Sequence, residues 1–311
     1  MERNLSLDIL KIFLAFFVVF LHTKIFLDIS QQTSFILVQG LFRIAVPLFL
    51  IITGYYFFLI NSRKQFIRWL SKVLILYIIW SLFYSPFWIS SNIYSFIFNI
   101  LNGYYVLWYL SGTAISGCLL YALRNIKSFY LISLTVLLFF FGCILQTLGN
   151  MHILSPFFDK LLNFNPVHRN FLFVCFPFLT MGYLINKHNH FIKDNIKIKA
   201  WMIPFLILLI ITESLINFNF ISNTEGLDQL FSLLLVAPLI FLFFLNLNIK
   251  GKSKNIATLS TAIYLIHPFF ILLLDEYFQN QNTLLSLIVL MLSIVSGFFL
   301  VFINKKLKYI L

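Results

Sequence analysis

The chain has 311 residues, of which 61% are hydrophobic and only 10% are charged. Soluble domains carry roughly 45–50% apolar and about 25% charged residues, so this composition excludes an ordinary soluble domain. It also excludes disorder, which requires low hydrophobicity, and the three cysteines lie in apolar runs that predict no disulfide scaffold. The basic residues that give the chain its net charge of +12 fall between long apolar stretches. This placement indicates loops beside a membrane rather than nucleic-acid binding.

Apolar runs recur along the whole chain, and a membrane-spanning helix needs about 20 mostly apolar residues. About ten runs approach this length, at residues 7–27, 37–60, 70–89, 104–123, 128–148, 170–186, 200–219, 229–248, 257–274 and 283–304. Only short connections remain between them. The sequence therefore predicts one all-α, polytopic membrane domain over residues 1–311, in which the helices themselves carry any chemistry.

The basic residues predict how this bundle is oriented. Most of the 22 Lys and Arg residues gather in alternate connections, around 63–72, 124–127, 187–199, 250–254 and 305–308. Positive charge marks the cytoplasmic ends of membrane helices. Both termini are therefore expected to be cytoplasmic.

The first run contains three ionisable residues on one helical stripe: Asp8, Lys11 and His22. Asp8 and Lys11 are three residues apart and are expected to form a structural ion pair near the cytoplasm. His22 lies roughly 16 Å farther along the helix axis than Lys11. Ionisable groups inside a span are functional candidates by default. The alternative is that His22 is an interfacial residue at the outer helix end.

Two later runs carry further candidates. Arg43 shares a helix face with Pro47, and an arginine buried in a membrane needs an anion or several carbonyls as partners. Tyr264 and His267 share a face in the ninth run, with Pro268 following directly. The alternatives are an arginine at the outer interface and a histidine held by structural hydrogen bonds.

Other polar and aromatic residues permit two interpretations each. Trp108 and Tyr109 belong to an interfacial aromatic belt or stack on a sugar. Glu213 is interfacial or orients a substrate hydroxyl. Arg68 and Lys72 are one turn apart and contact lipid headgroups or bind phosphates.

The remaining histidines predict no metal site. His188 and His190 are separated by one residue in a cytoplasmic connection, and no third ligand stands nearby. His152 and His168 are expected to be solvated in an outer connection.

Four sequence motifs together resemble the integral-membrane acyltransferase-3 family. The resemblance covers nearly the whole chain and rests on four segments in family order, namely Asp8-Ile9-Leu10-Lys11 with His22, Phe42-Arg43-Ile44-Ala45-Val46-Pro47-Leu48-Phe49 with Thr53-Gly54-Tyr55, Leu107-Trp108-Tyr109-Leu110, and Ser260-Thr261-Ala262-Ile263-Tyr264-Leu265-Ile266-His267. Family members typically carry Arg where Lys11 stands. They also carry an Arg-x-x-Arg pair followed by Pro where this chain has Arg68-x-x-x-Lys72 without the Pro.

The resemblance implies an enzyme of about ten helices in a bacterial inner membrane. It implies an acyl-coenzyme A donor, most simply acetyl-coenzyme A, on the cytoplasmic side, and a hydroxyl of a cell-envelope glycan or lipid-linked sugar as acceptor. The donor phosphates would lie near Lys11, Arg68 and Lys72. We expect no metal cofactor.

At the other end of the stripe, His22 would act as general base and Arg43 would stabilise the tetrahedral intermediate. His267 or Tyr264 would hold the acceptor or the leaving sulfur. The chain is also similar to the membrane half of certain serine racemases, for which transport has been suggested. The alternative function is therefore a transporter or flippase for an amino acid or a lipid-linked sugar, without acyl transfer.

Overall fold

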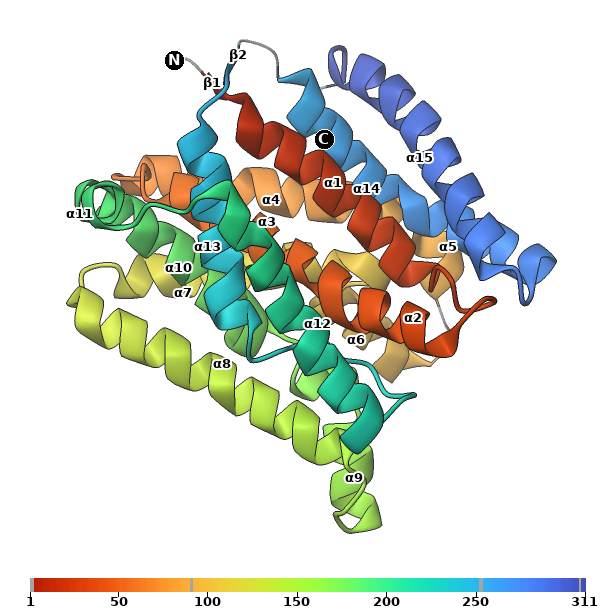
Figure 1. Ribbon diagram of the computed structural model, residues 1–311. Helices are drawn as coiled ribbons and strands as arrows, with labels where there is room; N and C mark the ends of the chain where they lie inside the picture. The colour runs from red at the N-terminus through yellow and green to blue at the C-terminus, as the bar shows by residue number, and fades with distance from the viewer. Residues whose placement is uncertain (1–2, 90–91, 252–253, 308) are drawn as a thin grey trace.

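Long helices packed side by side form almost all of the protein (Figure 1). The computed structural model describes residues 3–89, 92–251, 254–307 and 309–311. Two residues of the predicted cytoplasmic basic connections, Lys252 and Lys308, lie outside this described part.

Over these described ranges, fifteen α-helices follow in chain order. They are α1 (Leu5–His22), α2 (Gln31–Phe35), α3 (Ala45–Phe57), α4 (Arg63–Phe83), α5 (Ser85–Trp88), α6 (Ile93–Asn102), α7 (Trp108–Leu123), α8 (Ser128–Asn150), α9 (Pro156–Leu162), α10 (Phe176–Lys187), α11 (Asn189–Asn195), α12 (Ile203–Phe220), α13 (Leu233–Leu247), α14 (Asn255–Leu274) and α15 (Asn282–Asn304). Short π or 3-10 turns lie at η1 (Ile36–Gly40), η2 (Leu41–Ile44), η3 (Tyr105–Leu107), η4 (Asn165–Val167), η5 (Phe171–Cys175), η6 (Ala200–Met202) and η7 (Asp275–Phe278).

The all-α membrane bundle predicted from the sequence is confirmed. Within the described residues, eight helical segments are long and apolar enough to cross a membrane. They are Leu5–His22, Gln31–Phe57, Arg63–Phe83, Tyr105–Leu123, Ser128–Asn150, Ala200–Phe220, Asn255–Phe278 and Asn282–Asn304. The other two predicted runs coincide with shorter apolar helices, Phe171–Lys187 and Leu233–Leu247. The short apolar helix α6 was not predicted.

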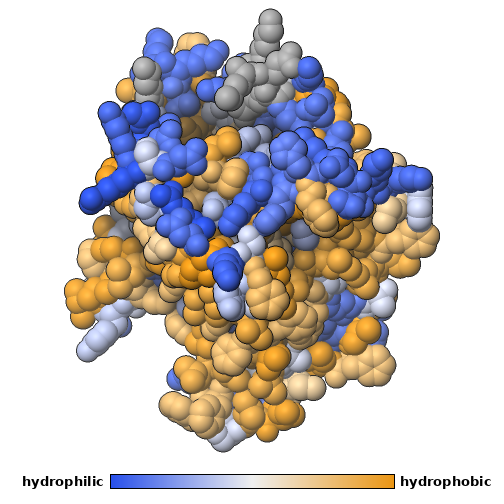
Figure 2. Space-filling model, turned by 90° about the vertical axis from the view of Figure 1, so that its left-hand side faces the viewer, coloured by the Kyte–Doolittle hydropathy of each residue, from blue (hydrophilic) through white to orange (hydrophobic). Residues whose placement is uncertain are grey.

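The outer surface of the bundle is apolar over most of its height. Figure 2 shows hydrophobic residues over the lower part of one face and hydrophilic residues gathered at the upper end, the end at which Figure 1 places the N-terminus. Large apolar side chains such as Phe129, Phe205 and Met291 are strongly exposed. In water such a surface would be costly, whereas lipid chains solvate it directly.

Glycines bring α3 and α10 into backbone contact. A Cβ atom added to Gly54 would lie 1.9 Å from the carbonyl oxygen of Leu179, and one added to Gly182 would lie 2.0 Å from that of Ile51. Any larger residue would push the helices apart. This close packing of small residues is typical of helices that associate inside a membrane.

A two-stranded ribbon ties the start of α1 to the segment before α14. Strand β1 (Arg3–Asn4) pairs antiparallel with β2 (Lys250–Gly251), and the Leu5 amide donates to the Ile249 carbonyl. Helices α1 and α14 therefore begin at the same end and run side by side (Figure 1). This arrangement brings the far end of α1 close to His267 in α14.

Candidate functional site

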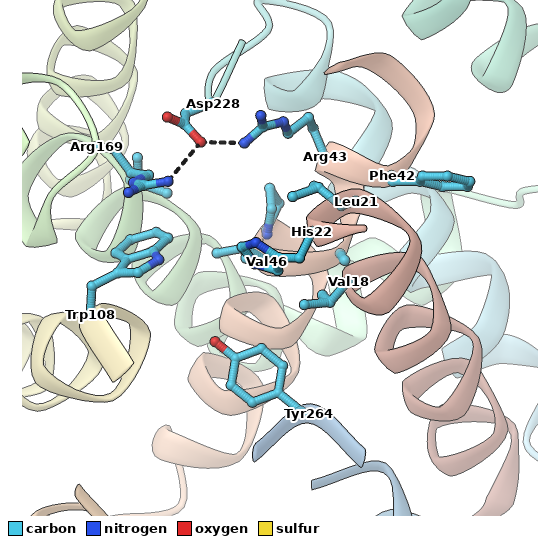
Figure 3. A pocket seen from close by; sticks show the side chains of 13 residues that line it. Val18, Leu21, His22, Phe42, Arg43, Val46, Trp108, Arg169, Asp228 and Tyr264 are labelled. Atoms are coloured by element: carbon cyan, nitrogen blue, oxygen red, sulfur yellow. Dashed lines mark hydrogen bonds and ion pairs between the residues drawn. The ribbon is translucent and has the colours of Figure 1, made fainter. Parts of the chain in front are cut away.

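A buried cavity lies at the end of α1 remote from the ribbon. Its volume is about 40 Å³, and we call it the histidine cavity (Figure 3). It is lined by Val18, Leu21, His22, Phe42, Arg43, Ala45, Val46, Pro47, Trp108, Arg169, Val174, Asp228 and Tyr264. A buried water occupies about 10–15 Å³ by the same measure. The cavity therefore accommodates a reacting group but not a whole sugar or cofactor.

Two histidines stack beside this cavity. The ring centroids of His22 and His267 are 5.5 Å apart with an interplanar angle of 29°, and the Tyr105 ring centroid lies 5.0 Å from that of His22. The His267 ring is fully buried, and its Nδ1 lies 3.2 Å from the Ile263 carbonyl oxygen. Because a carbonyl only accepts, neutral His267 carries its proton on Nδ1, and its buried Nε2 has no hydrogen-bond partner among the described residues.

Arg43 lines the same cavity and is held by two side-chain hydrogen bonds. Its Nη1 donates to Asp228 Oδ1 and its Nη2 donates to Gln39 Oε1. The same Gln39 oxygen accepts from the Leu227 amide at 2.9 Å. The Gln146 Oε1 atom accepts from the Asp228 amide at 2.7 Å. Two glutamines from membrane helices therefore fix the loop that carries Asp228.

A second arginine converges on the same carboxylate. Arg169 Nη1 donates to Asp228 Oδ1 at 3.4 Å (Figure 3). His168 Nε2 lies 3.7 Å from Asp228 Oδ2. Burial by itself would raise the pKa of Asp228, which lies in the loop between two helices. The guanidinium groups of Arg169 and Arg43 outweigh that effect and hold its pKa well below the usual range, so the carboxylate is ionised at neutral pH.

Local helix breaks position both arginines. Arg43 lies in the 3-10 turn η2 directly after the π turn η1, and Arg169 stands shortly before the π turn η5. Pro47 and Pro177 follow in the first turns of α3 and α10. Proline lacks the amide that a helix carbonyl four residues earlier requires, so it disfavours regular helix at these points. Irregular turns of this kind occur frequently at functional sites.

Tyr264 lines the histidine cavity, and Tyr109, the other tyrosine singled out from the sequence, packs against it. The Tyr264 hydroxyl donates to the Val106 carbonyl at 2.9 Å, which fixes its ring as a wall (Figure 3). Tyr109 packs edge-on against Tyr264 with ring centroids 5.6 Å apart. Trp108 lines the cavity, and the Arg169 guanidinium lies 5.2 Å from its ring centroid.

The three cations predicted to bind phosphate meet in another cavity. This basic cavity has a volume of about 340 Å³ and is lined by Lys11, Arg68 and Lys72 together with residues of α3 and α4. Arg68 and Lys72 are exposed. Lys11 Nζ lies 3.9 Å from Asp8 Oδ1, which is the ion pair expected from their spacing.

A middle cavity of about 140 Å³ separates these two sites. It shares Lys11 and Thr53 with the basic cavity and Tyr264 with the histidine cavity. Three cavities thus follow one another along α1, and each shares lining residues with the next. Thr53 and Tyr264 are thus walls common to neighbouring cavities.

Two sequence expectations need correction. Glu213 does not line any of these cavities, because its two oxygens accept from the Phe231 and Ser232 amides at 2.6 and 2.8 Å and so cap the start of α13. His168 is 3% exposed and contacts Asp228, so it is not solvated as expected. His152 is largely exposed, as expected.

Sequence reasoning missed Asp228, Arg169 and Gln39 as parts of the site. Asp228 and Arg169 stand in connections, where charges are normally solvated, and nothing local marks them as buried. The available signal was Arg43 itself, because a buried arginine requires an anionic partner. Among the described residues, no group of three or more His, Cys, Asp or Glu side chains is arranged to hold a metal ion.

Comparison with known proteins places the chain among acyltransferases. The family described as “Acyltransferase domain” matches residues 4–303. An amino-acid racemase from Enterococcus faecalis is 26% identical over 334 residues, which cover 99% of this chain and 47% of that protein. A serine/alanine racemase from Enterococcus gallinarum is 26% identical over 340 residues, covering 98% and 46% respectively. The chain spans about half the length of these curated relatives. No solved structure gives a significant match.

Proposed function

The chain belongs to the acyltransferase-3 family, and on that premise we propose that it transfers a short acyl group, acetyl by preference, from acyl-coenzyme A to a cell-envelope glycan. The acceptor group is a hydroxyl, and the protein works as a multi-pass enzyme of a bacterial inner membrane. The observation that carries the proposal is the row of three cavities from Lys11, Arg68 and Lys72 to His22.

The donor would enter from the basic cavity. Coenzyme A has a phosphorylated nucleotide head, which suits three cations around about 340 Å³. Its pantetheine arm is thin and mostly uncharged, which suits the narrow middle cavity along α1. The thioester carbonyl then reaches the histidine cavity. Only the acyl group fits into about 40 Å³, which favours a short chain.

The transfer itself needs a base and an oxyanion donor. His22 takes the proton of the acceptor hydroxyl while the oxygen attacks the thioester carbonyl carbon. Arg43 stabilises the negative oxygen of the tetrahedral intermediate, and its bonds to Asp228 and Gln39 hold it in place. The C–S bond then breaks, and the coenzyme A thiolate takes the proton from His22. His267 stacks on His22 and orients it.

The direct test is the variant His22→Ala in purified full-length protein. Release of free thiol from acetyl-coenzyme A in the presence of envelope glycan should fall by about 10²–10⁴-fold, the usual contribution of a general base. Donor binding, measured by calorimetry, should remain. The matched control His190→Ala changes an exposed histidine far from the cavities and should retain full activity. Undiminished thiol release by His22→Ala would refute the assignment.

A transport function is the second candidate, because both curated relatives are named as amino-acid racemases and the chain matches only about half of each. The same cavities would then pass an amino acid rather than a thioester. Uptake of serine into liposomes that contain the protein, with no thiol release from acetyl-coenzyme A, would favour transport over acyl transfer.

A further inference from the structure

The charges around the histidine cavity do not balance. Arg43 and Arg169 contribute two guanidinium groups, and Asp228 supplies a single carboxylate (Figure 3). With the imidazoles neutral, one positive charge remains in a site that is largely withdrawn from water. Such a charge is costly unless an anion accompanies it.

Hydrogen-bond donors at this site are also left over. Arg43 Nε is buried and has no partner among the described residues. Arg169 makes a single hydrogen bond, 3.4 Å long, within the described part of the chain. A guanidinium can donate five hydrogen bonds and binds carboxylates and phosphates in a bidentate way.

Arg169 is the accessible member of the group. Its side chain is 25% exposed, compared with 12% for Arg43 and 8% for Asp228. It lies over Trp108, which also lines a side cavity of about 400 Å³ between α6, α7 and η5. That volume falls in the range of small-molecule sites, roughly 300–1,000 Å³. Trp108 is therefore the wall between a roomy cavity and the reacting centre.

We propose that Arg169 binds a singly charged oxyanion on the acceptor, so that the preferred acceptor is an acidic glycan rather than a neutral one. The body of the acceptor lies in the side cavity, its carboxylate or phosphodiester pairs with Arg169 beside Trp108, and a hydroxyl reaches His22. The inference rests on the proposed function, since it names the class of acceptor for that site.

Binding in the absence of donor tests the site separately from catalysis. We expect the purified protein to bind methyl glucuronoside, measured by calorimetry, and to bind methyl glucoside far more weakly. Arg169→Gln should weaken glucuronoside binding about tenfold or more. Arg169→Lys should be intermediate, because it keeps the charge but not the planar fork. The matched control Arg124→Gln alters another arginine that stacks on an aromatic ring, Tyr121, and should bind normally.

A parallel titration with dimethyl phosphate separates the two possible anions, since the tighter binder identifies the acceptor group as a phosphodiester or a carboxylate. Acetyl-coenzyme A binding by Arg169→Gln reports that the variant is folded. Equal binding of acidic and neutral glycosides, or unchanged binding by folded Arg169→Gln, would overturn the proposal. Glucuronoside binding without any thiol release would instead refute acyl transfer and leave the anion site standing.

Discussion

The two ends of the row of cavities hold their cations in opposite ways. In the basic cavity, Arg68 and Lys72 are exposed and surround about 340 Å³. In the histidine cavity, Arg43 and Arg169 converge on Asp228 around about 40 Å³. Exposed cations attract a large, flexible polyanion without fixing its orientation. Cations held in place by hydrogen bonds instead stabilise negative charge at one defined atom. The first arrangement suits capture of a donor, and the second suits chemistry.

Removing the carboxylate that Arg43 and Arg169 share should have the largest effect, and it should fall on the histidine cavity. Asp228→Ala leaves two partly buried guanidinium groups without their anion, and breaking a buried ion pair costs about 3–5 kcal/mol of folding stability. Thermal unfolding in detergent should show this loss, and thiol release should be abolished. The control Asp194→Ala removes an exposed carboxylate and should change neither. Normal stability of Asp228→Ala would show that the network is not energetically coupled.

The pH dependence of that loss follows from the lowered pKa of Asp228. A carboxylate with a lowered folded-state pKa stabilises the protein above its unfolded pKa of about 3.9. This stabilisation is lost only as the pH falls toward the folded value. The stability difference between wild type and Asp228→Ala should therefore be equal at pH 8 and pH 5.

Substitutions in the basic cavity should change donor affinity rather than folding stability. Arg68→Ala combined with Lys72→Ala should raise the apparent KM for acetyl-coenzyme A about tenfold or more, because charge-assisted contacts to phosphate are lost. The melting temperature should stay unchanged. Lys193→Ala with Lys197→Ala removes two exposed lysines elsewhere and serves as the control. An unchanged KM would show that Arg68 and Lys72 do not bind the donor and would favour their alternative role, contact with lipid headgroups.

Raising the salt concentration should weaken binding in the basic cavity more than binding at Arg169, and this is the smallest of the expected effects. The Debye length shrinks from about 10 Å at 0.1 M to about 3 Å at 1 M ionic strength, and buried pairs are screened less than exposed ones. The KM for the donor should therefore rise several-fold over this range, while glucuronoside binding at Arg169 should change less. Equal salt dependence at both ends would contradict the difference in burial.

The helical periodicity of the sequence was sufficient to predict the bundle and the stripe from Asp8 to His22. It also pointed to Arg43, Trp108 and Tyr264, which line the histidine cavity. These residues lie on apolar runs, where a polar or aromatic side chain stands out.

The rest of the site depends on long-range packing that no local pattern records. Asp228 is buried only because Gln146 and Gln39, from distant segments, hold its loop over the cavity. From the sequence, Glu213 was a candidate for orienting a substrate hydroxyl. In the structure it accepts hydrogen bonds from the Phe231 and Ser232 amides, directly before α13. The π turns beside Arg43 and Arg169 could not be predicted from the sequence either, because a single π turn leaves the helical pattern of apolar residues intact.

The short β1–β2 ribbon anchors α1 at the end remote from the histidine cavity. It fastens α1 to the chain entering α14, and the Thr23 hydroxyl meets that of Ser286 in α15 at 2.6 Å. Helix α1, which carries His22, is therefore held at both ends, and His22 stacks on His267 of α14. We therefore expect an acceptor to enter from the side of Trp108, whose indole lines both the histidine cavity and the side cavity, so that rotation of this ring would join the two.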